Sequence, residues 1–329
     1  MNARCILHTG PNEVRLDEFE LRAPGAGELV VTSRYTCVSP GTELRCLSGA
    51  DPAQSPFPFV PGYAMTGEVT TVGDGVDVPV GAQVYCSGTT DAGRWKTQWG
   101  GHVSHAVLPA AKVDVIPKTV DPLDATLTHL GAIAMRGVRN GRPQLAEKVA
   151  VIGLGVLGQL SARLHAIAGA HVIACDLSAH RVAVANAAGV KAVVPEGTIV
   201  DTYAGLMPGG ADLVVDVTGA PPVLQQAMKL ARELEWTDDK PAPPRVVVQG
   251  SYASPIIVDY NDAFTREMPL FFPRDCVSYD RRDVLSLLSA GTLSVRDLIT
   301  DVRKPEDAQR TYDELRERDT KLLTVAFEW

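Results

Sequence analysis

The sequence predicts an α/β protein, with a doubly wound parallel sheet in addition to a β-barrel-like domain. Three observations carry this prediction. The chain has 329 residues, enough for two domains of about 150 residues each. Short strands with frequent glycine and proline fill the first 120 residues, and apolar strands alternate with helices further on. We therefore divide the chain into a β domain at residues 1–120, an α/β domain at 121–268 and a segment at 269–329 that is expected to complete the first domain.

The β domain is predicted from three runs. Residues 29–32 are rich in β-branched side chains. Residues 66–73 alternate like a half-buried strand, and residues 81–85 follow a turn that contains proline. Dense turn residues between positions 56 and 62 keep the strands short, which is typical of a twisted, barrel-like domain.

The α/β domain begins with a helix expected at residues 123–140, with Asp121 or Thr119 as its cap and Pro122 near its first turn. Apolar strands then alternate with helices, as in parallel sheets that are covered on both faces. The strands are expected at residues 148–152, 171–175, 192–194, 212–217 and 245–249, the helices at 160–169, 179–188 and 223–234, a polar loop at 235–244, and a last amphipathic helix at 283–290.

Composition excludes several classes of protein. Lys and Arg total 31 and Asp and Glu total 39, and the net charge of −8 argues against a nucleic-acid partner. No apolar run reaches the roughly 20 residues that span a bilayer, and residues 1–10 lack the pattern of a secretory signal. We expect no membrane partner and a cytoplasmic location, where thiols stay reduced and mostly buried. The cysteines form no CxxC pair: Cys5, Cys37, Cys46, Cys86, Cys175 and Cys276.

A glycine turn predicts a dinucleotide site. Gly153, Gly155 and Gly158 form a GxGxxG motif that follows a strand and opens a helix, as a Rossmann domain requires. Gly153 permits the tight turn, Gly155 lets a pyrophosphate approach the backbone, and Gly158 lets the helix pack against the sheet. Val156 and Leu157 begin the helix, whose free N–H groups and positive dipole end attract an anion. The alternative is a Rossmann-like fold without a ligand.

Asp176 ends the second strand of this unit, where an acid can accept hydrogen bonds from an adenosine ribose. The same carboxylate would repel a 2′-phosphate, so the sequence favours NAD(H) over NADP(H). Arg181 is the opposing signal, because a guanidinium can bind that phosphate. We expect Arg181 instead to stack near the adenine or to lie on the surface.

Two further loops end strands of the same sheet. One contains Thr218 and Gly219, and the other contains Gly250, Ser251 and Tyr252. Ligands of open parallel sheets lie beyond the carboxyl ends of the strands, so both loops are candidates to line a dinucleotide cleft. The alternative is that both are ordinary turns.

With these motifs, the chain resembles the medium-chain dehydrogenase/reductase superfamily, the alcohol-dehydrogenase-like enzymes, over nearly its whole length. Residues 40–43 (Pro-Gly-Thr-Glu) resemble the family's Cys-Gly-Thr-Asp segment, and residues 61–64 its Gly-His-Glu segment. The resemblance implies a GroES-like fold for the catalytic domain, NAD binding by residues 121–268, and a homodimer. Further matches are the glycine strand at 67–69, the Gly-Gly-Phe-Ala-Glu stretch at 99–102, and the C-terminal return at 298–300 and 305–308.

The resemblance does not extend to the residues that bind the catalytic zinc. Zinc-dependent members bind catalytic zinc through the cysteine of the first segment and the histidine of the second, and these positions carry Pro40 and Tyr63 here. Proline has no metal-binding group, and a phenol with a pKa near 10 is a poor zinc ligand. Ala64 replaces the second segment's glutamate, and the four cysteines of the family's structural zinc lobe are absent. We expect no metal; a rebuilt zinc site would draw on Cys37, Glu43, His102 or His129.

The longer string Val-Ser-Pro-Gly-Thr-Glu, at residues 38–43, resembles a subgroup of these enzymes. That subgroup includes the dehydrogenase that oxidises the hydroxyethyl side chain of bacteriochlorophyllide. One short motif does not identify a substrate.

Without zinc, a hydrogen-bonding group must stabilise the reacting oxygen and exchange its proton. Tyr63 is the first candidate because it replaces a metal ligand; otherwise it fills the space that zinc leaves. Thr42 matches the hydroxyl that relays protons in related enzymes, or is a turn residue. Glu43 orients a partner or binds substrate, or forms a structural salt bridge. His102 and His129 have an unperturbed pKa near 6.5 that suits acid–base work, although a lone histidine is more often structural.

These residues predict a zinc-independent, NAD(H)-dependent dehydrogenase that interconverts a secondary alcohol and a ketone. The substrate would be a polyol, cyclitol, sugar-derived or ring side-chain alcohol. A quinone or enoyl C=C reductase is the alternative enzyme, which Asp176 disfavours because many such enzymes prefer NADPH. A non-catalytic dinucleotide-binding sensor or scaffold is the alternative from another class. Aromatic residues near the proposed mouth either stack on a substrate ring or pack internally: Phe57, Phe59, Tyr63, Trp95 and Trp99.

Overall fold

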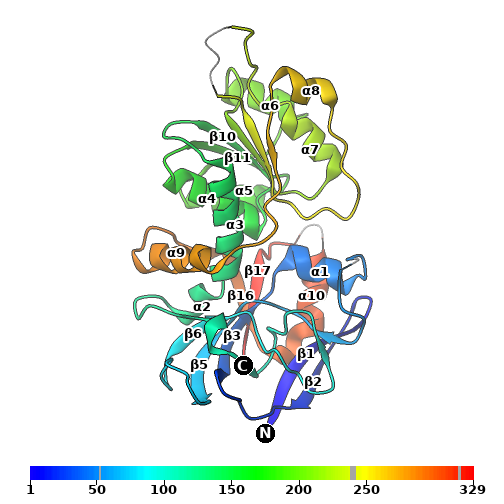
Figure 1. Ribbon diagram of the computed structural model, residues 1–329. Helices are drawn as coiled ribbons and strands as arrows, with labels where there is room; N and C mark the ends of the chain where they lie inside the picture. The colour runs from blue at the N-terminus through cyan, green and yellow to red at the C-terminus, as the bar shows by residue number, and fades with distance from the viewer. Residues whose placement is uncertain (52, 238–241, 318–319) are drawn as a thin grey trace. The chain divides into compact units, whose positions relative to one another are not determined.

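The computed structural model describes residues 1–51, 53–237, 242–317 and 320–329, which form two compact units (Figure 1). The N-terminal unit combines Met1–His129 with Arg281–Trp329, and the central unit is Leu130–Asp280. The C-terminal segment thus lies in one unit with the first part of the chain. Both divisions fall later than residues 120 and 268, where the sequence analysis placed them.

Polar contacts explain why the first division is later than predicted, because residues just beyond position 120 are held by the N-terminal unit. Helix α2 (Pro122–Ala125) receives a hydrogen bond at its Pro122 carbonyl from the Thr66 hydroxyl, at 2.9 Å. Arg296 lies 3.0 Å from Asp121 and 2.5 Å from Asp124. Asp121 is the N-cap of α2, as predicted, and accepts the Leu123 N–H at 2.8 Å.

The helix predicted at residues 123–140 is wrong as one element, because the chain forms two helices there. Helix α2 ends at Ala125, and α3 runs from Thr128 to Gly141. The Thr126 hydroxyl donates to the Leu123 carbonyl and the Thr128 hydroxyl to the Ala125 carbonyl, both at 2.6 Å. Threonine hydroxyls that bond nearby carbonyls compete with the regular helical pattern, which accounts for the interruption.

The N-terminal unit contains two sheets. The strand predicted at 29–32 lies within β3, and those predicted at 66–73 and 81–85 overlap β5 and β6 with bounds shifted by one or two residues, whereas helix α1 (Pro40–Leu47) was not predicted. The larger sheet has the order β16-β17-β3-β5-β6-β9, with β8 also paired to β3, and the smaller has the order β2-β1-β4-β7. The strands are β1 (Asn2–Gly10), β2 (Glu13–Glu20), β3 (Glu28–Cys37), β4 (Phe59–Val60), β5 (Met65–Val72), β6 (Gln83–Cys86), β7 (Lys96–Thr97), β8 (His105–Pro109), β9 (Val113–Val115), β16 (Ile299–Arg303) and β17 (Thr324–Glu328).

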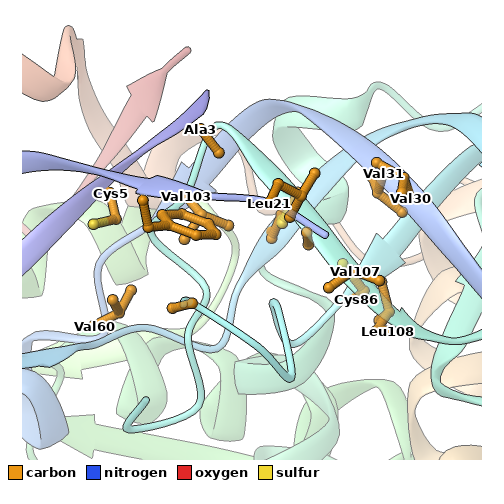
Figure 2. Packing of buried hydrophobic residues seen from close by; sticks show 14 of the residues in the cluster. Ala3, Cys5, Leu21, Val30, Val31, Val60, Cys86, Val103, Val107 and Leu108 are labelled. Carbon is orange, nitrogen blue, oxygen red and sulfur yellow. The ribbon is translucent and has the colours of Figure 1, made fainter. Parts of the chain in front are cut away.

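The side chains between these sheets form a continuous apolar core (Figure 2). Val31, Val103 and Leu108 are fully or almost fully buried in it, and each such side chain stabilises the fold by about 1.5–3 kcal/mol. Cys5 and Cys86 belong to the same cluster, and burial raises the pKa of each thiol to about 12. All six cysteines are free and five are buried, as predicted for reduced, core-forming thiols.

The C-terminal segment completes the larger sheet. Strand β17 pairs antiparallel with β3, with Ala326 opposite Cys37, and β16 extends the sheet beyond it. Between them lies α10 (Ala308–Arg316), which buries Tyr312 and Leu315 against Ile6 and Phe327. This packing is why a stretch too short to fold alone belongs to the N-terminal unit.

The central unit is the predicted Rossmann-like α/β fold, with one parallel sheet of order β12-β11-β10-β13-β14-β15. The five predicted strands are present, and the order reverses between β10 and β13, where such sheets bind ligands. No helix in the described part of the chain is long and apolar enough to cross a membrane. The strands are β10 (Lys148–Ile152), β11 (His171–Cys175), β12 (Lys191–Val193), β13 (Leu213–Asp216), β14 (Arg245–Val248) and β15 (Leu270–Phe271); the helices are α4 (Val156–Ile167), α5 (Ala179–Ala187), α6 (Ile199–Leu206), α7 (Pro221–Met228) and α8 (Tyr260–Thr265). Helix α9 (Ser278–Ser289) begins at the end of this unit and belongs from Arg281 onward to the N-terminal unit.

Two predicted helices have the wrong bounds. The one expected at 223–234 is α7, which ends at Met228 because the following residues pair with Ala211: its N–H bonds the Leu230 carbonyl, and its carbonyl accepts from Arg232. The one expected at 283–290 begins earlier, as α9. Within the loop predicted at 235–244, residues 238–241 lie outside the described part, and the remainder is irregular as expected.

Candidate functional site

Two segments that the sequence analysis singled out lie against each other in the N-terminal unit. The Gly101 N–H bonds the Gly62 carbonyl at 2.7 Å, and the His102 N–H bonds the Pro61 carbonyl at 3.0 Å. A Cβ on Gly101 would lie 2.6 Å from the Gly62 carbonyl, and one on Gly62, whose φ is +87°, would lie 2.5 Å from the His102 ring. Only glycine allows so close an approach, and the approach fixes the neighbouring Tyr63.

Tyr63 lies at the centre of a group of hydroxyls. Its side chain is almost fully buried, and its Oη lies 2.5 Å from Ser39 Oγ and 3.5 Å from Thr42 Oγ1. Its carbonyl accepts a hydrogen bond from the Tyr85 hydroxyl at 2.6 Å. Two of the predicted candidates, Tyr63 and Thr42, are therefore neighbours. A phenol that contacts two hydroxyls can pass a proton to either of them.

Ser39 is a site residue that sequence reasoning missed. It is the N-cap of α1, and serine at that position usually bonds the first N–H groups of the helix. Its side chain makes no such bond here and contacts Tyr63 instead. The signal was present in the sequence, because Ser39 stands directly before Pro40, but position alone predicts only a cap.

Glu43 and His102 form a buried pair beneath this hydroxyl group. Both are fully buried, and His102 Nε2 lies 3.0 Å from Glu43 Oε2. Glu43 also accepts the Ser39 N–H at 2.7 Å and the Tyr312 hydroxyl at 2.5 Å. The other imidazole nitrogen lies 2.8 Å from the Thr36 hydroxyl. With all of these polar atoms already bonded, the geometry favours the structural alternative that was stated for each residue.

The electrostatics of this cluster keep Glu43 ionised. Burial alone would raise the pKa of its carboxyl, but His102, the Tyr312 hydroxyl and the Ser39 N–H together hold that pKa below its ordinary value of 4.5. Burial next to Glu43 raises the pKa of Tyr312 well above 10. Burial lowers the pKa of nearby His8 to about 3, so its ring is neutral and packs edge-on against Tyr312 and Phe59.

His129, the fifth candidate, lies beside Tyr63. It is half-buried on α3, and its ring centroid is 4.8 Å from that of Tyr63. On the same phenol, the Trp99 indole packs edge-to-face with centroids 5.1 Å apart. The structure thus brings Tyr63, Thr42 and His129 together and places Glu43 and His102 deeper.

In the central unit, the glycine turn has the geometry that the motif predicts. Gly153 has φ +93°, and a Cβ on Gly158 would lie 1.9 Å from the Gly153 carbonyl oxygen. Gly155 is the N-cap of α4, and a Cβ there would project into open space. Val156 and Leu157 form the first turn of α4, which no side chain caps. The turn therefore presents backbone N–H groups to an anion.

Asp176 bonds this turn directly. Its Oδ2 accepts the Leu154 N–H at 2.7 Å, and its Oδ1 accepts the Ser178 N–H at 2.8 Å. A carboxylate has about four acceptor positions, so both oxygens can still accept from a ligand. Arg181 Nη1 lies 3.6 Å from Asp176, and the buried Arg181 Nε has no hydrogen-bond partner among the described residues. An unpaired donor beside the turn fits a dinucleotide's polar atoms.

The two further loops are joined through Asp216, a buried carboxyl that sequence reasoning missed. Its Oδ1 accepts the Thr218 N–H at 2.8 Å and the Thr218 hydroxyl at 2.7 Å, and its Oδ2 accepts the Tyr252 hydroxyl. Burial raises the pKa of Asp216. An acid at the end of an apolar strand was the available signal.

The backbones of these loops are in close contact. A Cβ on Gly250 would lie 2.3 Å from the Gly219 nitrogen, and one on Gly219 would lie 2.4 Å from the Ser251 carbonyl oxygen. Both glycines are therefore needed for packing, and the loops are held as one unit at the carboxyl ends of β13 and β14.

Comparisons with known proteins agree with this geometry. Residues 25–118 match the alcohol dehydrogenase GroES-like domain, and residues 156–234 match the zinc-binding dehydrogenase family, together more than half of the chain. The chain belongs to the medium-chain dehydrogenase/reductase superfamily. It is an oxidoreductase of the alcohol-dehydrogenase-like type, and the resemblance to this superfamily stated from the sequence is confirmed.

Three similar proteins accompany these family matches. The 2-desacetyl-2-hydroxyethyl bacteriochlorophyllide A dehydrogenase of Cereibacter sphaeroides is 26% identical over 327 residues, covering 95% of this chain and 94% of the relative. An Escherichia coli alcohol dehydrogenase complexed with NADH has a TM-score of 0.86 at 21% identity, covering 100% and 99% of the two chains. A Sinorhizobium meliloti protein of the zinc-binding dehydrogenase type, bound to NADP, has a TM-score of 0.86 at 21% identity and full coverage of both. These two structures show the shared fold.

Because one matching family of this superfamily is described as zinc-binding, the donors in the N-terminal unit need a test. By the resemblance stated from the sequence, Pro40 and Tyr63 stand where zinc-dependent members have ligands. Glu43 and His102 bond each other, and burial raises the pKa of the Cys37 thiol to about 12, whereas zinc binds the thiolate. Cys37, Glu43 and His102 therefore do not fit a catalytic zinc.

Replacing Glu43 tests the buried pair. Glu43→Gln removes the negative charge to which three donors bond. We therefore expect the free energy of unfolding at pH 7 to be about 3–5 kcal/mol lower than in the wild type. Because the folded-state pKa of Glu43 is depressed, its contribution is complete above the unfolded pKa near 4.5 and is lost as pH falls through the folded value. The difference in the free energy of unfolding between the wild type and Glu43→Gln should therefore become smaller as the pH falls. Urea unfolding from pH 7 to pH 3 measures this.

The matched control is Glu20→Gln, which changes an exposed glutamate of β2 and should leave stability nearly unchanged. If the difference in the free energy of unfolding between wild type and Glu43→Gln stays constant down to pH 3, the assigned ionisation of Glu43 is wrong.

Proposed function

We propose that the protein is a zinc-independent, NAD(H)-dependent dehydrogenase that interconverts a secondary alcohol and a ketone. The observation that carries the proposal is the Tyr63 hydroxyl, which stands at the family's zinc-ligand position and contacts the hydroxyls of Ser39 and Thr42. The substrate would be a polyol, cyclitol, sugar-derived or ring side-chain alcohol. Relatives that act on a hydroxyethyl side chain and on a deoxygalactonate support this range.

The proposed cofactor rests on the central unit. Gly153, Gly155 and Gly158 with the first turn of α4 would hold the pyrophosphate, and Asp176 the adenosine ribose. Thr218, Gly219 and the loop from Gly250 to Tyr252 would line the remaining part of the dinucleotide. A nicotinamide, when bound, supplies or accepts the hydride. The negative charge of Asp176 favours NAD(H), although one structural relative holds NADP.

In the proposed mechanism the chain's own residues handle the proton. During ketone reduction, the Tyr63 hydroxyl donates its proton to the carbonyl oxygen, and Ser39 and Thr42 stabilise the charge that forms on Tyr63 Oη. During alcohol oxidation, the proton moves in the opposite direction. His129, whose ring contacts Tyr63, would assist by acid–base exchange. Glu43 and His102 would act by holding Ser39 in place rather than by touching substrate.

We also propose a cytoplasmic homodimer. The six free thiols support a reducing compartment. Strand β15 is outermost in its sheet, and Phe264 and Phe272 on the neighbouring surface are 55% and 56% exposed, which suits a protein–protein interface. Analytical ultracentrifugation that finds only monomer would contradict the dimer.

Metal and cofactor content test the proposal as a whole. We expect the chelator-washed protein to hold no zinc and to bind NADH in preference to NADPH, because the donor set does not fit zinc and Asp176 repels a 2′-phosphate. Elemental analysis and fluorescence titration measure both. Stoichiometric zinc would overturn zinc independence. Preferential NADPH binding would favour a C=C reductase, and binding without turnover would favour a sensor.

Asp176→Ser tests the cofactor preference. Loss of the carboxylate removes the repulsion of a 2′-phosphate, so the ratio of the NADPH and NADH dissociation constants should fall by about tenfold or more. Asp201→Ser, an exposed acid on α6, is the control and should leave the ratio unchanged. An unchanged ratio in Asp176→Ser would refute the role assigned to Asp176.

Tyr63→Phe tests the acid–base hydroxyl. We expect kcat to fall by about 10²–10⁴-fold while the dissociation constant of NADH stays within about twofold, because the phenol acts on substrate and not on cofactor. Tyr85→Phe removes a buried hydroxyl that bonds the Tyr63 carbonyl and so reports how much kcat changes when a neighbouring structural hydrogen bond is lost. Equal kcat for wild type and Tyr63→Phe would reduce Tyr63 to a packing residue.

A further inference from the structure

Trp99 adopts a backbone conformation that a bulky residue rarely takes. Its φ is +72°, in the left-handed region, and its side chain is 41% exposed. The conformation is imposed from both sides. The Gln98 N–H bonds the Val60 carbonyl at 2.8 Å, and Gly100, with φ +74°, packs so closely that a Cβ would lie 2.7 Å from the Thr89 carbonyl oxygen. Strain of about 1–3 kcal/mol at an exposed aromatic residue, held by its surroundings, indicates a function.

The indole of Trp99 stands directly beside the proposed acid–base group. Its ring packs edge-to-face on Tyr63, with centroids 5.1 Å apart and planes at 81°. Tyr63 itself is only 5% exposed, so Trp99 supplies the accessible aromatic surface at this position. Thr42 and His129, which also contact Tyr63, are half-buried.

The other aromatic residues predicted near the mouth are already engaged in packing. Phe57 stacks on the fully buried Phe59, with centroids 5.1 Å apart. Trp95 donates its indole N–H to the Glu18 carbonyl at 3.2 Å, and the Arg94 guanidinium covers its ring at 4.3 Å. Of the five, Trp99 alone combines high exposure with contact to Tyr63.

We propose that Trp99 is a stacking platform that selects substrates whose reacting carbon is attached directly to a planar, conjugated ring. This inference rests on the proposed function, because it assigns the substrate class of the Tyr63 site. A flat ring can lie against the indole in an offset or edge-to-face arrangement, which brings its carbinol or carbonyl substituent to the neighbouring phenol. A puckered ring of the same size loses most of that face-to-face contact.

The experiment compares two ketones that differ in ring planarity but little in size, acetophenone and cyclohexyl methyl ketone. We expect the wild type loaded with NAD⁺, which cannot reduce a ketone, to bind acetophenone more tightly by about two- to tenfold. Trp99→Asn should abolish this preference, because asparagine tolerates positive φ but offers no aromatic face. Trp99→Phe should retain part of it. Trp95→Asn is the matched control and should keep the wild-type preference.

Ketone binding is measured by calorimetry and turnover in a separate assay. A failure of the proposed function can therefore be told apart from a failure of the role proposed for Trp99. Absence of NADH binding, or of turnover with both ketones and with a panel of secondary alcohols, counts against the proposed function. Equal affinity of the wild type for the two ketones, no binding of either, or an undiminished preference in Trp99→Asn overturns the role of Trp99. The comparison in unmodified protein holds even where a variant fails to fold, which thermal unfolding reports.

Discussion

One buried carboxylate, that of Glu43, connects three segments of the N-terminal unit at the candidate site. Its two oxygens accept hydrogen bonds from Ser39 at the start of α1, from His102 in the glycine-rich segment, and from Tyr312 on α10. These donors come from three distant parts of the chain. A buried charge is strongly destabilising when it loses a partner, so the fold must keep all three contacts together. Since the Ser39 hydroxyl contacts Tyr63, the same charge determines where the proposed acid–base group stands.

The fold was predictable where a single physical pattern decides it. The five apolar runs of the central unit became parallel strands because only burial on both faces accommodates them. Prediction failed where side chains compete with the backbone. The hydroxyls of Thr126 and Thr128 interrupt a helix whose apolar periodicity is otherwise continuous. Helix α1 escaped prediction because its start, Pro40 after Ser39, was interpreted only as part of a family motif.

The sequence identified candidate site residues by their chemistry, but it did not identify the residues to which they hydrogen bond. Glu43 and His102 carry suitable chemistry, yet their availability depends on Tyr312 and Thr36, which no local pattern links to them. Ser39 and Asp216 were missed for the converse reason: each occupies an ordinary position in sequence and gains its role from a tyrosine brought in by the fold. Glycines were the most reliable signal, because a close backbone approach such as that of Gly62 and Gly101 tolerates no other residue.

The pairing of β17 with β3 has a consequence for how the chain folds during synthesis. Ala326 lies opposite Cys37, and the Trp329 indole bonds the Thr36 hydroxyl, so the last residues of one β3 edge, Tyr35–Cys37, find their partner only after nearly 290 intervening residues have been made. At about 5–20 residues per second, that edge waits for on the order of tens of seconds. Every residue of Leu130–Asp280 leaves the ribosome within this interval. The nascent chain thus carries an unpaired strand edge open to wrong partners, and chaperone demand should concentrate there.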